Sequence, residues 1–145
     1  MKKFGKVFAA VMAGAMMVAC MSSCGEGKTG KNYAEGNTEY YLGASGPLTG
    51  GASVYGQAVK NAAQMAVDDI NADGGVNGVK IKFVMMDDEH KAEKVSTNYT
   101  AMYEKGMQVS LGCVTTNPCL EFKTLSKEDN VFFLTPSASA NEVVE

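Results

Sequence analysis

Hydrophobic and polar residues from position 39 onward alternate between strand-like runs and helix-like stripes. Tyr40–Ala44 is a short apolar run, and the glycine-dense stretch SGPLTGGASVYG after it predicts a loop. Apolar residues then recur every three or four positions, which predicts a helix from about Tyr55 to Ala72. The apolar stripe of this helix consists of Val59, Ala63, Ala66, Val67 and Ile70.

The same alternation continues to position 145. Asp73, Gly74 and Gly75 end the first helix, and an Asn-Gly turn leads into KIKFVMMDD, whose β-branched and aromatic residues are typical of a strand. Further along, the pattern predicts strands at Met107–Val114 and Val131–Thr135, and helices from Ala92 to about Gly106, from Thr116 to about Asp129, and from Ser139 onward.

The order β-α-β-α-β-α-β predicts an α/β fold, a Rossmann-like lobe with a parallel sheet covered by helices on both faces. In such sheets ligands bind outside the carboxyl ends of the strands. The segments that follow the strands are therefore the candidate site, namely Ser45–Tyr55, Asp87–His90, Thr115–Pro118 and Thr135–Asn141.

Charge excludes one class of partner. The 145 residues carry 13 basic and 16 acidic side chains, a formal net charge of −3, so no basic face for nucleic acid is expected. The 46% hydrophobic content suits one globular domain.

The first residues are typical of an export signal. Three lysines, at positions 2, 3 and 6, precede an uncharged stretch, Val7–Ala19, that is too short for a permanent membrane span. The following MVACMSSCGEGKTGK resembles the lipobox of bacterial lipoproteins. We expect a signal peptide over residues 1–23, lipidation at Cys24 and a polar tether over residues 24–38. Cys20 is the alternative lipidation site, and simple cleavage to a soluble exported protein is the other alternative.

Two of the candidate loops combine hydroxyls with a helix start. Thr115, Thr116 and Asn117 lie where free N–H groups and the helix dipole favour an anion. Ser137 and Ser139 also precede an expected helix, and their hydroxyl and carbonyl oxygens suit an ammonium group. The alternative is that these residues only cap helices, since Ser139 and Glu142 match the S-x-x-E capping box.

The motifs GPLTG, YG, A-x-DIN-x-x-GG-x-x-G and the strand ending in DD resemble the branched-chain amino acid (Leu/Ile/Val) binding proteins of ABC transporters, which are type I periplasmic binding proteins. LGCVTTNP and FLTPSAS fall at the positions of that family's hydroxyl-rich loops. The resemblance covers about Tyr40 to Glu145. It implies that residues 39–145 are an incomplete N-terminal lobe, because family members are more than twice as long and have a second lobe.

The resemblance also implies roles for individual residues. Val114, Thr115 and Thr116 match the loop that binds the ligand carboxylate, and Tyr55 matches the aromatic residue that covers the ligand side chain. The TPA-type loop falls on Thr135–Ser139. Within it, Ser137 matches the position whose backbone carbonyl contacts the ammonium, and Ser139 matches a hydroxyl contact. Ala138, between them, is also assigned to ligand binding. A serine at Ser137, where alanine is usual, leaves the identity of the ligand open.

The sequence therefore predicts a lipid-anchored, extracytoplasmic solute-binding protein of the bacterial cell envelope that delivers an amino acid to ABC permease subunits. It predicts no enzyme activity, no cofactor and no metal. Three alternatives remain: a ligand-sensing domain of the same fold coupled to signalling, a binder of amides or urea, and an exported enzyme that would lack a catalytic set.

The other residues that could carry chemistry have simpler structural explanations. Asp87 and Asp88 resemble the acidic pair of receiver domains, but the third strand lacks the aspartate that phosphoryl transfer needs, so a solvated strand end is expected. His90 is the only histidine and is expected to be an exposed first-turn residue. Cys113 and Cys119 could form a disulfide outside the cytoplasm or remain two buried free thiols.

Overall fold

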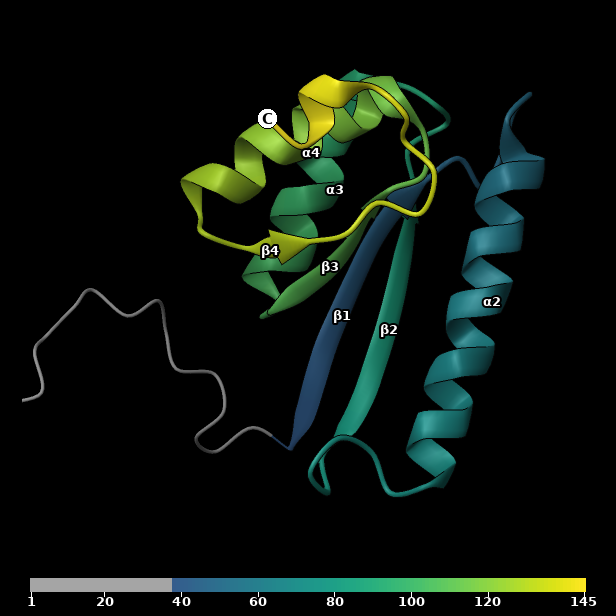
Figure 1. Ribbon diagram of the computed structural model, residues 1–145, viewed down its shortest axis with the longest axis vertical. Helices are drawn as coiled ribbons and strands as arrows, with labels where there is room; N and C mark the ends of the chain where they lie inside the picture. Colours follow the sequence, from purple (N-terminus) through teal and green to yellow (C-terminus); the bar gives the residue numbers. More distant parts are fainter. Residues whose placement is uncertain (1–37) are drawn as a thin grey trace, which may run out of the picture. The chain divides into compact units, whose positions relative to one another are not determined.

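The computed structural model describes residues 38–145, which form a single parallel sheet with helices on both faces. In chain order the elements are β1 (Glu39–Gly46), α2 (Ser53–Ala72), β2 (Lys80–Asp87), α3 (Ala92–Glu104), β3 (Val109–Cys113), α4 (Thr116–Glu128), β4 (Phe132–Phe133) and a short 3-10 helix, η1 (Asn141–Val143) (Figure 1). The strand order is β2-β1-β3-β4, and every pair is parallel. The predicted α/β class and element order are confirmed.

The signal peptide, the tether and both candidate lipidation sites, Cys20 and Cys24, fall almost entirely on residues 1–37 and so lie outside the described residues. Among the helices of residues 38–145, none is long and apolar enough to cross a membrane.

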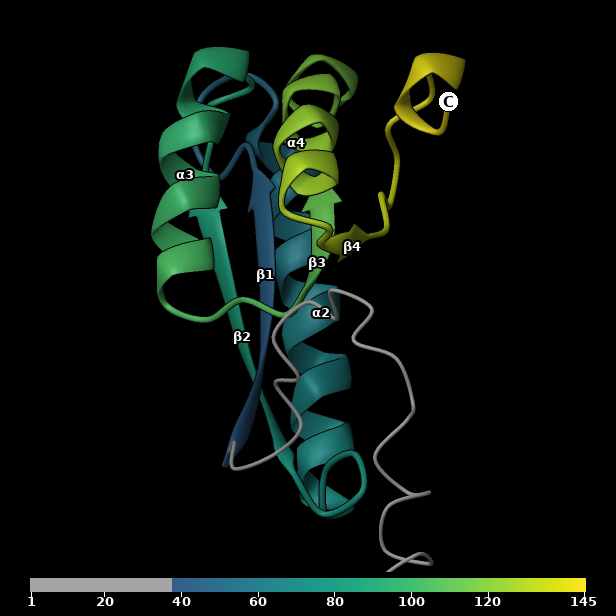
Figure 2. The ribbon, with the colours of Figure 1, turned by 90° about the vertical axis from the view of Figure 1, so that its left-hand side faces the viewer.

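Helices α3 and α4 lie side by side on one face of the sheet, and α2 lies on the other (Figure 2). The larger core is under α3 and α4, where the Tyr99 ring meets the Phe122 ring edge to face at 5.0 Å between centroids. The smaller core is formed by Ala44, Met85 and Val114, with Val59 of α2 packed against it. Of the apolar stripe predicted for α2, Val67 is fully buried, whereas Ala66 and Ile70 remain exposed.

One irregularity of the sheet lies directly before the candidate site. The pairing of β1 with β3 shifts register between Gly43 and Ser45, because two β3 residues, Leu111 and Gly112, stand opposite one residue of β1. Gly112 has a left-handed φ of 59°, a conformation that glycine adopts without steric cost. Such a bulge redirects the chain that follows it, here the segment from Cys113 to Thr116.

Two expectations about the last segment are wrong. The fourth strand is only Phe132–Phe133 rather than residues 131–135, and no α-helix begins at Ser139, because the only helical turn there is η1, preceded by Ala140 without a side-chain cap. The capping box of Ser139 and Glu142 is therefore not formed. The physical reason is that residues 135–139 run beside the β3–α4 loop and hydrogen bond to it instead.

Candidate functional site

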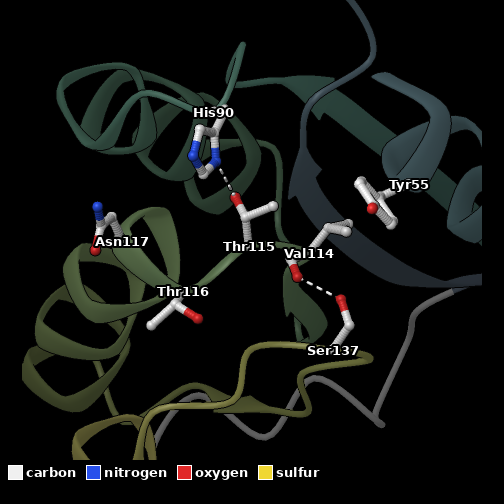
Figure 3. A pocket seen from close by; sticks show the side chains of 7 residues that line it. All are labelled: Tyr55, His90, Val114, Thr115, Thr116, Asn117 and Ser137. Atoms are coloured by element: carbon white, nitrogen blue, oxygen red, sulfur yellow. Dashed lines mark hydrogen bonds between the residues drawn. The ribbon is translucent and has the colours of Figure 1, made fainter. Parts of the chain in front are cut away.

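A cavity of about 340 Å³ lies at the carboxyl end of the sheet, where the fold class predicts a ligand site. Figure 3 shows that its lining side chains come from α2, the β2–α3 loop, the β3–α4 loop, the start of α4 and the segment after β4. The lining residues are Tyr55, His90, Val114, Thr115, Thr116, Asn117 and Ser137. Five of the seven residues assigned to ligand binding from the sequence are thus brought together around one cavity.

The start of α4 provides donors for an anion. Thr115 is the N-cap residue, with an extended backbone and no capping side chain, and the first amide to bond within the helix is that of Cys119, to Thr115 O at 3.1 Å. Pro118 has no N–H, so the amides of Thr116 and Asn117 are the first-turn donors without a partner inside the helix. Together with the helix dipole, these two amides favour a negatively charged group at this end of α4.

The hydroxyl of Thr116 lies at the same helix start. Its Oγ1 accepts a hydrogen bond from the N–H of Ser139 at 3.3 Å. A threonine hydroxyl that accepts in this way keeps its own O–H as a donor. Thr116 can therefore donate to an oxygen of a ligand while it holds the segment after β4 in place.

Three hydrogen bonds continue the β3–β4 pairing beyond the short β4 strand. Thr135 Oγ1 donates to Cys113 O at 3.0 Å, Ser137 Oγ donates to Val114 O at 2.5 Å, and the N–H of Ser139 donates to Thr116. We call these three bonds the hydroxyl ladder. Ala138 lies inside the ladder, where its N–H donates to Thr135 Oγ1 at 3.0 Å. The ladder sets the distance between the two loops that were assigned to the carboxylate and the ammonium.

Tyr55, in the first turn of α2, forms the opposite side of the cavity (Figure 3). The residue is 64% exposed. Its position depends on the neighbouring Gly56, which is buried against the loop after β1. A Cβ atom at Gly56 would lie 1.9 Å from Pro47 O, so only glycine allows α2 to start this close to the loop. This contact is the structural basis of the YG motif.

His90 lines the cavity, although the sequence interpretation gave it no role. It precedes α3 rather than lying in its first turn, and its Nδ1 shares a hydrogen bond with Thr115 Oγ1 at 2.9 Å. Glu89 and His90 have left-handed φ values of 51° and 62°, which are uncommon for residues other than glycine. A signal for this turn does exist in the sequence, since each of two consecutive aspartates can bind the N–H two residues later.

The carboxylates of Asp87 and Asp88 hold this turn. Asp87 Oδ1 accepts the N–H of Glu89 and Asp88 Oδ1 accepts the N–H of His90, both at 2.9 Å. Asp87 also accepts the N–H of Leu48 at 2.8 Å and the hydroxyl of Thr49 at 2.6 Å. The solvated strand end expected at this position is wrong for Asp88, which is completely buried beside Ser45.

The two neighbouring aspartates differ in acidity. Burial alone raises the pKa of Asp87, but hydrogen bonds from the Thr49 hydroxyl and from backbone N–H groups outweigh it and leave the pKa below its ordinary value. Burial raises the pKa of Asp88 above its ordinary value despite the hydrogen bonds from His90 and Ser45. Across residues 38–145, no group of three potential metal ligands is close enough to hold a metal ion.

Cys113 and Cys119 are free thiols, both fully buried, and no disulfide joins them. Burial raises the pKa of Cys113 well above its ordinary value, and burial also raises that of Cys119. Because the thiolate is the reactive form, neither cysteine has the character of a nucleophile.

Comparison with known proteins identifies the family. A family model described as "Periplasmic binding protein" matches residues 39–145. The Leu/Ile/Val-binding protein BraC3 of Rhizobium johnstonii is 32% identical over 104 residues, which are 72% of this chain and 28% of that protein.

Solved structures with the same fold include the substrate-binding protein LivJ from Streptococcus pneumoniae in complex with isoleucine, with a TM-score of 0.68 at 24% identity, over 72% of this chain and 30% of that one. A solute-binding protein from Rhodopseudomonas palustris in complex with 3,4-dihydroxybenzoic acid has a TM-score of 0.67 at 19% identity, over 74% and 29% of the two chains. The chain therefore spans less than a third of the length of these relatives. It belongs to the periplasmic binding protein family, and its parallel lobe has the type I fold of the branched-chain amino acid binding members.

Proposed function

We propose that this chain is the ligand-binding N-terminal lobe of a solute-binding protein that captures an α-amino acid and delivers it to an ABC permease. The observation that carries the proposal is the position of the Thr116 hydroxyl. It lies at the start of α4, beside two first-turn amides, and lines a cavity that Ser137 also lines. Donors for a carboxylate and oxygens for an ammonium thus lie on neighbouring walls of one cavity.

In the proposed complex, the carboxylate of the ligand accepts hydrogen bonds from Thr116 Oγ1 and from the N–H groups of Thr116 and Asn117. Charge-assisted hydrogen bonds of this kind are about twice as strong as neutral ones. The Ser137 hydroxyl is engaged with Val114 O, so the carbonyl of Ser137 and the hydroxyl of Ser139 receive the ammonium group. The Tyr55 ring covers the side chain of the ligand.

The class of ligand is inferred from what the relatives bind. BraC3 is named as a Leu/Ile/Val-binding protein, and the LivJ structure contains isoleucine. Branched-chain amino acids are therefore the first candidates. The relatives are more than three times as long as the matched part of this chain, so we place this lobe in a longer protein whose second lobe closes over the ligand.

We further propose that the protein is exported and anchored by lipid at Cys24, with Cys20 as the alternative. Residues 1–23 would be the signal peptide and residues 24–38 the tether. Several acyl chains would hold the protein firmly, since a single chain gives only marginal membrane binding. Mass spectrometry of the N-terminal peptide from membrane fractions tests this part, and an unmodified Cys24 and Cys20 in a released soluble protein would refute it.

The ligand proposal is tested by thermal unfolding of the full-length protein against a panel of amino acids, amides and urea. A ligand at a hundredfold excess over its Kd stabilises the folded state by about 2.7 kcal/mol. We expect stabilisation by leucine, isoleucine or valine. A panel in which amides or urea stabilise the protein and no α-amino acid does would refute the proposed ligand class.

A further inference from the structure

We propose that Asp87 and Thr49 are positioning residues of the binding site, which together hold the start of α2 and with it the Tyr55 ring at the cavity. The inference rests on the proposed function and deepens it, since Tyr55 is the residue proposed to cover the side chain of the ligand. Neither Asp87 nor Thr49 is among the residues that line the cavity. Both act on the ligand through Tyr55.

The first observation concerns how α2 is attached to the lobe. Gly56 and Val67 are the buried residues among the 20 of α2, a helix that the structure describes in full. The helix also begins at its N-cap, Ala52, without a side-chain cap. Because most helical stability in proteins comes from tertiary packing, a helix with so few buried residues is held weakly by packing alone. The position of its first turn therefore depends on the loop that precedes it.

The loop before α2 is held by the carboxylate of Asp87. Asp87 Oδ1 accepts the N–H groups of Leu48 at 2.8 Å and of Thr49 at 3.3 Å, and Asp87 Oδ2 accepts the hydroxyl of Thr49 at 2.6 Å. An aspartate is ionised at neutral pH, so both oxygens are acceptors. Asp87 is the last residue of β2, and its backbone stands opposite Gly46 of β1. The loop is thus tied to the sheet, the rigid part of the lobe.

The loop in turn contacts the first turns of α2. Gln57 Nε2 donates a hydrogen bond to Leu48 O at 2.9 Å. Gly56 lies so close to the loop that a Cβ atom there would be 1.9 Å from Pro47 O. Both of these α2 residues directly follow Tyr55 in the chain. A continuous series of contacts therefore runs from the end of β2, through the loop, to the residues next to Tyr55.

Tyr55 is the lining residue that α2 contributes to the cavity (Figure 3). Because the residue is 64% exposed, its own packing holds the ring weakly, and the place of the ring follows from the place of the helix start. A binding group that is displaced by about 1 Å loses much of its contact with a ligand. Asp87 and Thr49 therefore set how well Tyr55 covers an apolar ligand side chain.

The test is a double-mutant cycle of Thr49 and Tyr55, in which calorimetric titration of the full-length protein measures the affinity for L-leucine. The variants are Thr49→Val, which removes the hydroxyl and keeps the shape of the side chain, Tyr55→Ala, and the combination of the two. Asp87→Asn, which exchanges one acceptor oxygen for a donor, is taken through the same cycle. Melting curves verify that each variant is folded.

Two controls separate placement of the ring from other effects. Thr49→Ser keeps the hydroxyl and is the conservative control. The second control, Asn71→Ala, removes two hydrogen bonds of 2.7 Å that the Asn71 side chain makes with the backbone of Ile81. These bonds hold the far end of α2, so their loss loosens the helix away from Tyr55.

We expect Thr49→Val and Tyr55→Ala each to bind L-leucine roughly three- to tenfold more weakly than the wild-type protein. The combined variant should bind no more weakly than Tyr55→Ala, because Thr49 acts by placing the ring. Asp87→Asn should lower the affinity in the same way, again without further loss once Tyr55 is removed. Thr49→Ser and Asn71→Ala should bind within about twofold of wild type.

Wild-type affinity in folded Thr49→Val would overturn the inference. An equal further loss on adding Thr49→Val to Tyr55→Ala, or an equal loss in Asn71→Ala, would also overturn it, because either result indicates general loosening rather than placement of the ring. Wild-type affinity in Tyr55→Ala would overturn the proposed role of Tyr55 and the inference with it. Failure of the wild-type protein to bind any α-amino acid would instead overturn the proposed function.

Discussion

Ser137 Oγ donates a hydrogen bond to the carbonyl oxygen of Val114, 23 residues earlier in the chain. This bond is the middle step of the hydroxyl ladder, and it joins two loops that both line the cavity. It also shows what a serine does at the position where the resembling family usually has alanine. Its hydroxyl binds the loop that contains Val114, and its carbonyl is left to contact a ligand.

Replacing Ser137 with alanine removes the middle step of the ladder. We expect the free energy of unfolding to fall by about 0.5–1.5 kcal/mol, the ordinary contribution of one hydrogen bond. Affinity for the amino acid should change less than stability, because the carbonyl of residue 137 is retained. Urea denaturation and calorimetry measure the two effects. Ser96→Ala, an exposed change on α3, is the control, and equal stability of both variants would contradict the ladder.

Gly56→Ala tests the contact that positions Tyr55. The added methyl group would lie 1.9 Å from Pro47 O, so α2 or the loop after β1 must shift. We expect a loss of about 1–3 kcal/mol in stability, typical of overpacking, and weaker ligand binding because Tyr55 moves with the helix. Gly51→Ala is a matched control, since its Cβ would meet nothing within 4 Å. Equal stability of the two alanine variants would contradict the close contact between Gly56 and Pro47.

Asp87 and Asp88 predict opposite effects of pH on stability. The pKa of Asp88 is raised in the folded state, so its contribution is present at low pH and is lost as pH rises through the folded pKa. The pKa of Asp87 is lowered, so its contribution is present above the ordinary pKa of an aspartate and is lost as pH falls through the folded pKa.

Denaturation of Asp87→Asn and Asp88→Asn at several pH values between 2.5 and 7 checks these signs. We expect Asp87→Asn to lose more stability, relative to wild type, at pH 7 than at pH 2.5. The free energy of unfolding of Asp88→Asn, relative to that of wild type, should be highest at pH 7, because a buried charge then destabilises the wild-type protein. The reverse order of the two pH trends would show that the assigned pKa directions are wrong.

We expect the two buried thiols to be labelled slowly by a thiol reagent. Because Cys113 and Cys119 are fully buried and burial raises the pKa of each, we expect neither to react with iodoacetamide in the folded protein and both to react after denaturation. Peptide mass spectrometry distinguishes these two cysteines from Cys20 and Cys24. Recovery of a peptide pair joined by a Cys113–Cys119 disulfide from the exported protein would contradict the free-thiol state.

The sequence predicted the fold well where the signals are local. The apolar repeat of α3 and the glycines that end the helices predicted the element bounds to within a few residues of those observed. The parallel arrangement of the strands followed from the alternation of strands and helices. It failed at β4 and η1, because those segments depend on contacts with the distant β3–α4 loop. After Phe133, the N–H of Leu134 still bonds to the carbonyl of Ser110, but from Thr135 onward side-chain hydroxyls, rather than backbone N–H groups, bond to the β3 side.

The candidate site was predictable only in part, for the same reason. Thr116 and Ser137 lie in loops with a recognisable composition at the ends of strands. His90 has no such pattern around it, and its contact with Thr115, 25 residues later, joins the loops that follow β2 and β3. A lone histidine is usually a surface residue, and only the pairing of both β2 and β3 with β1 brings this one to the cavity.

Thr116 is the residue on which the proposed carboxylate site depends most directly. The variant Thr116→Val keeps the volume of the side chain and removes its hydroxyl, and Thr100→Val, at an exposed position of α3, is the matched control. Calorimetric titration of the full-length protein with L-leucine should show affinity reduced roughly ten- to hundredfold in Thr116→Val, equivalent to about 1.5–3 kcal/mol for a hydrogen bond to a charged group. The affinity of Thr100→Val should equal that of wild type. Wild-type affinity in Thr116→Val would contradict the assignment of the carboxylate to the start of α4.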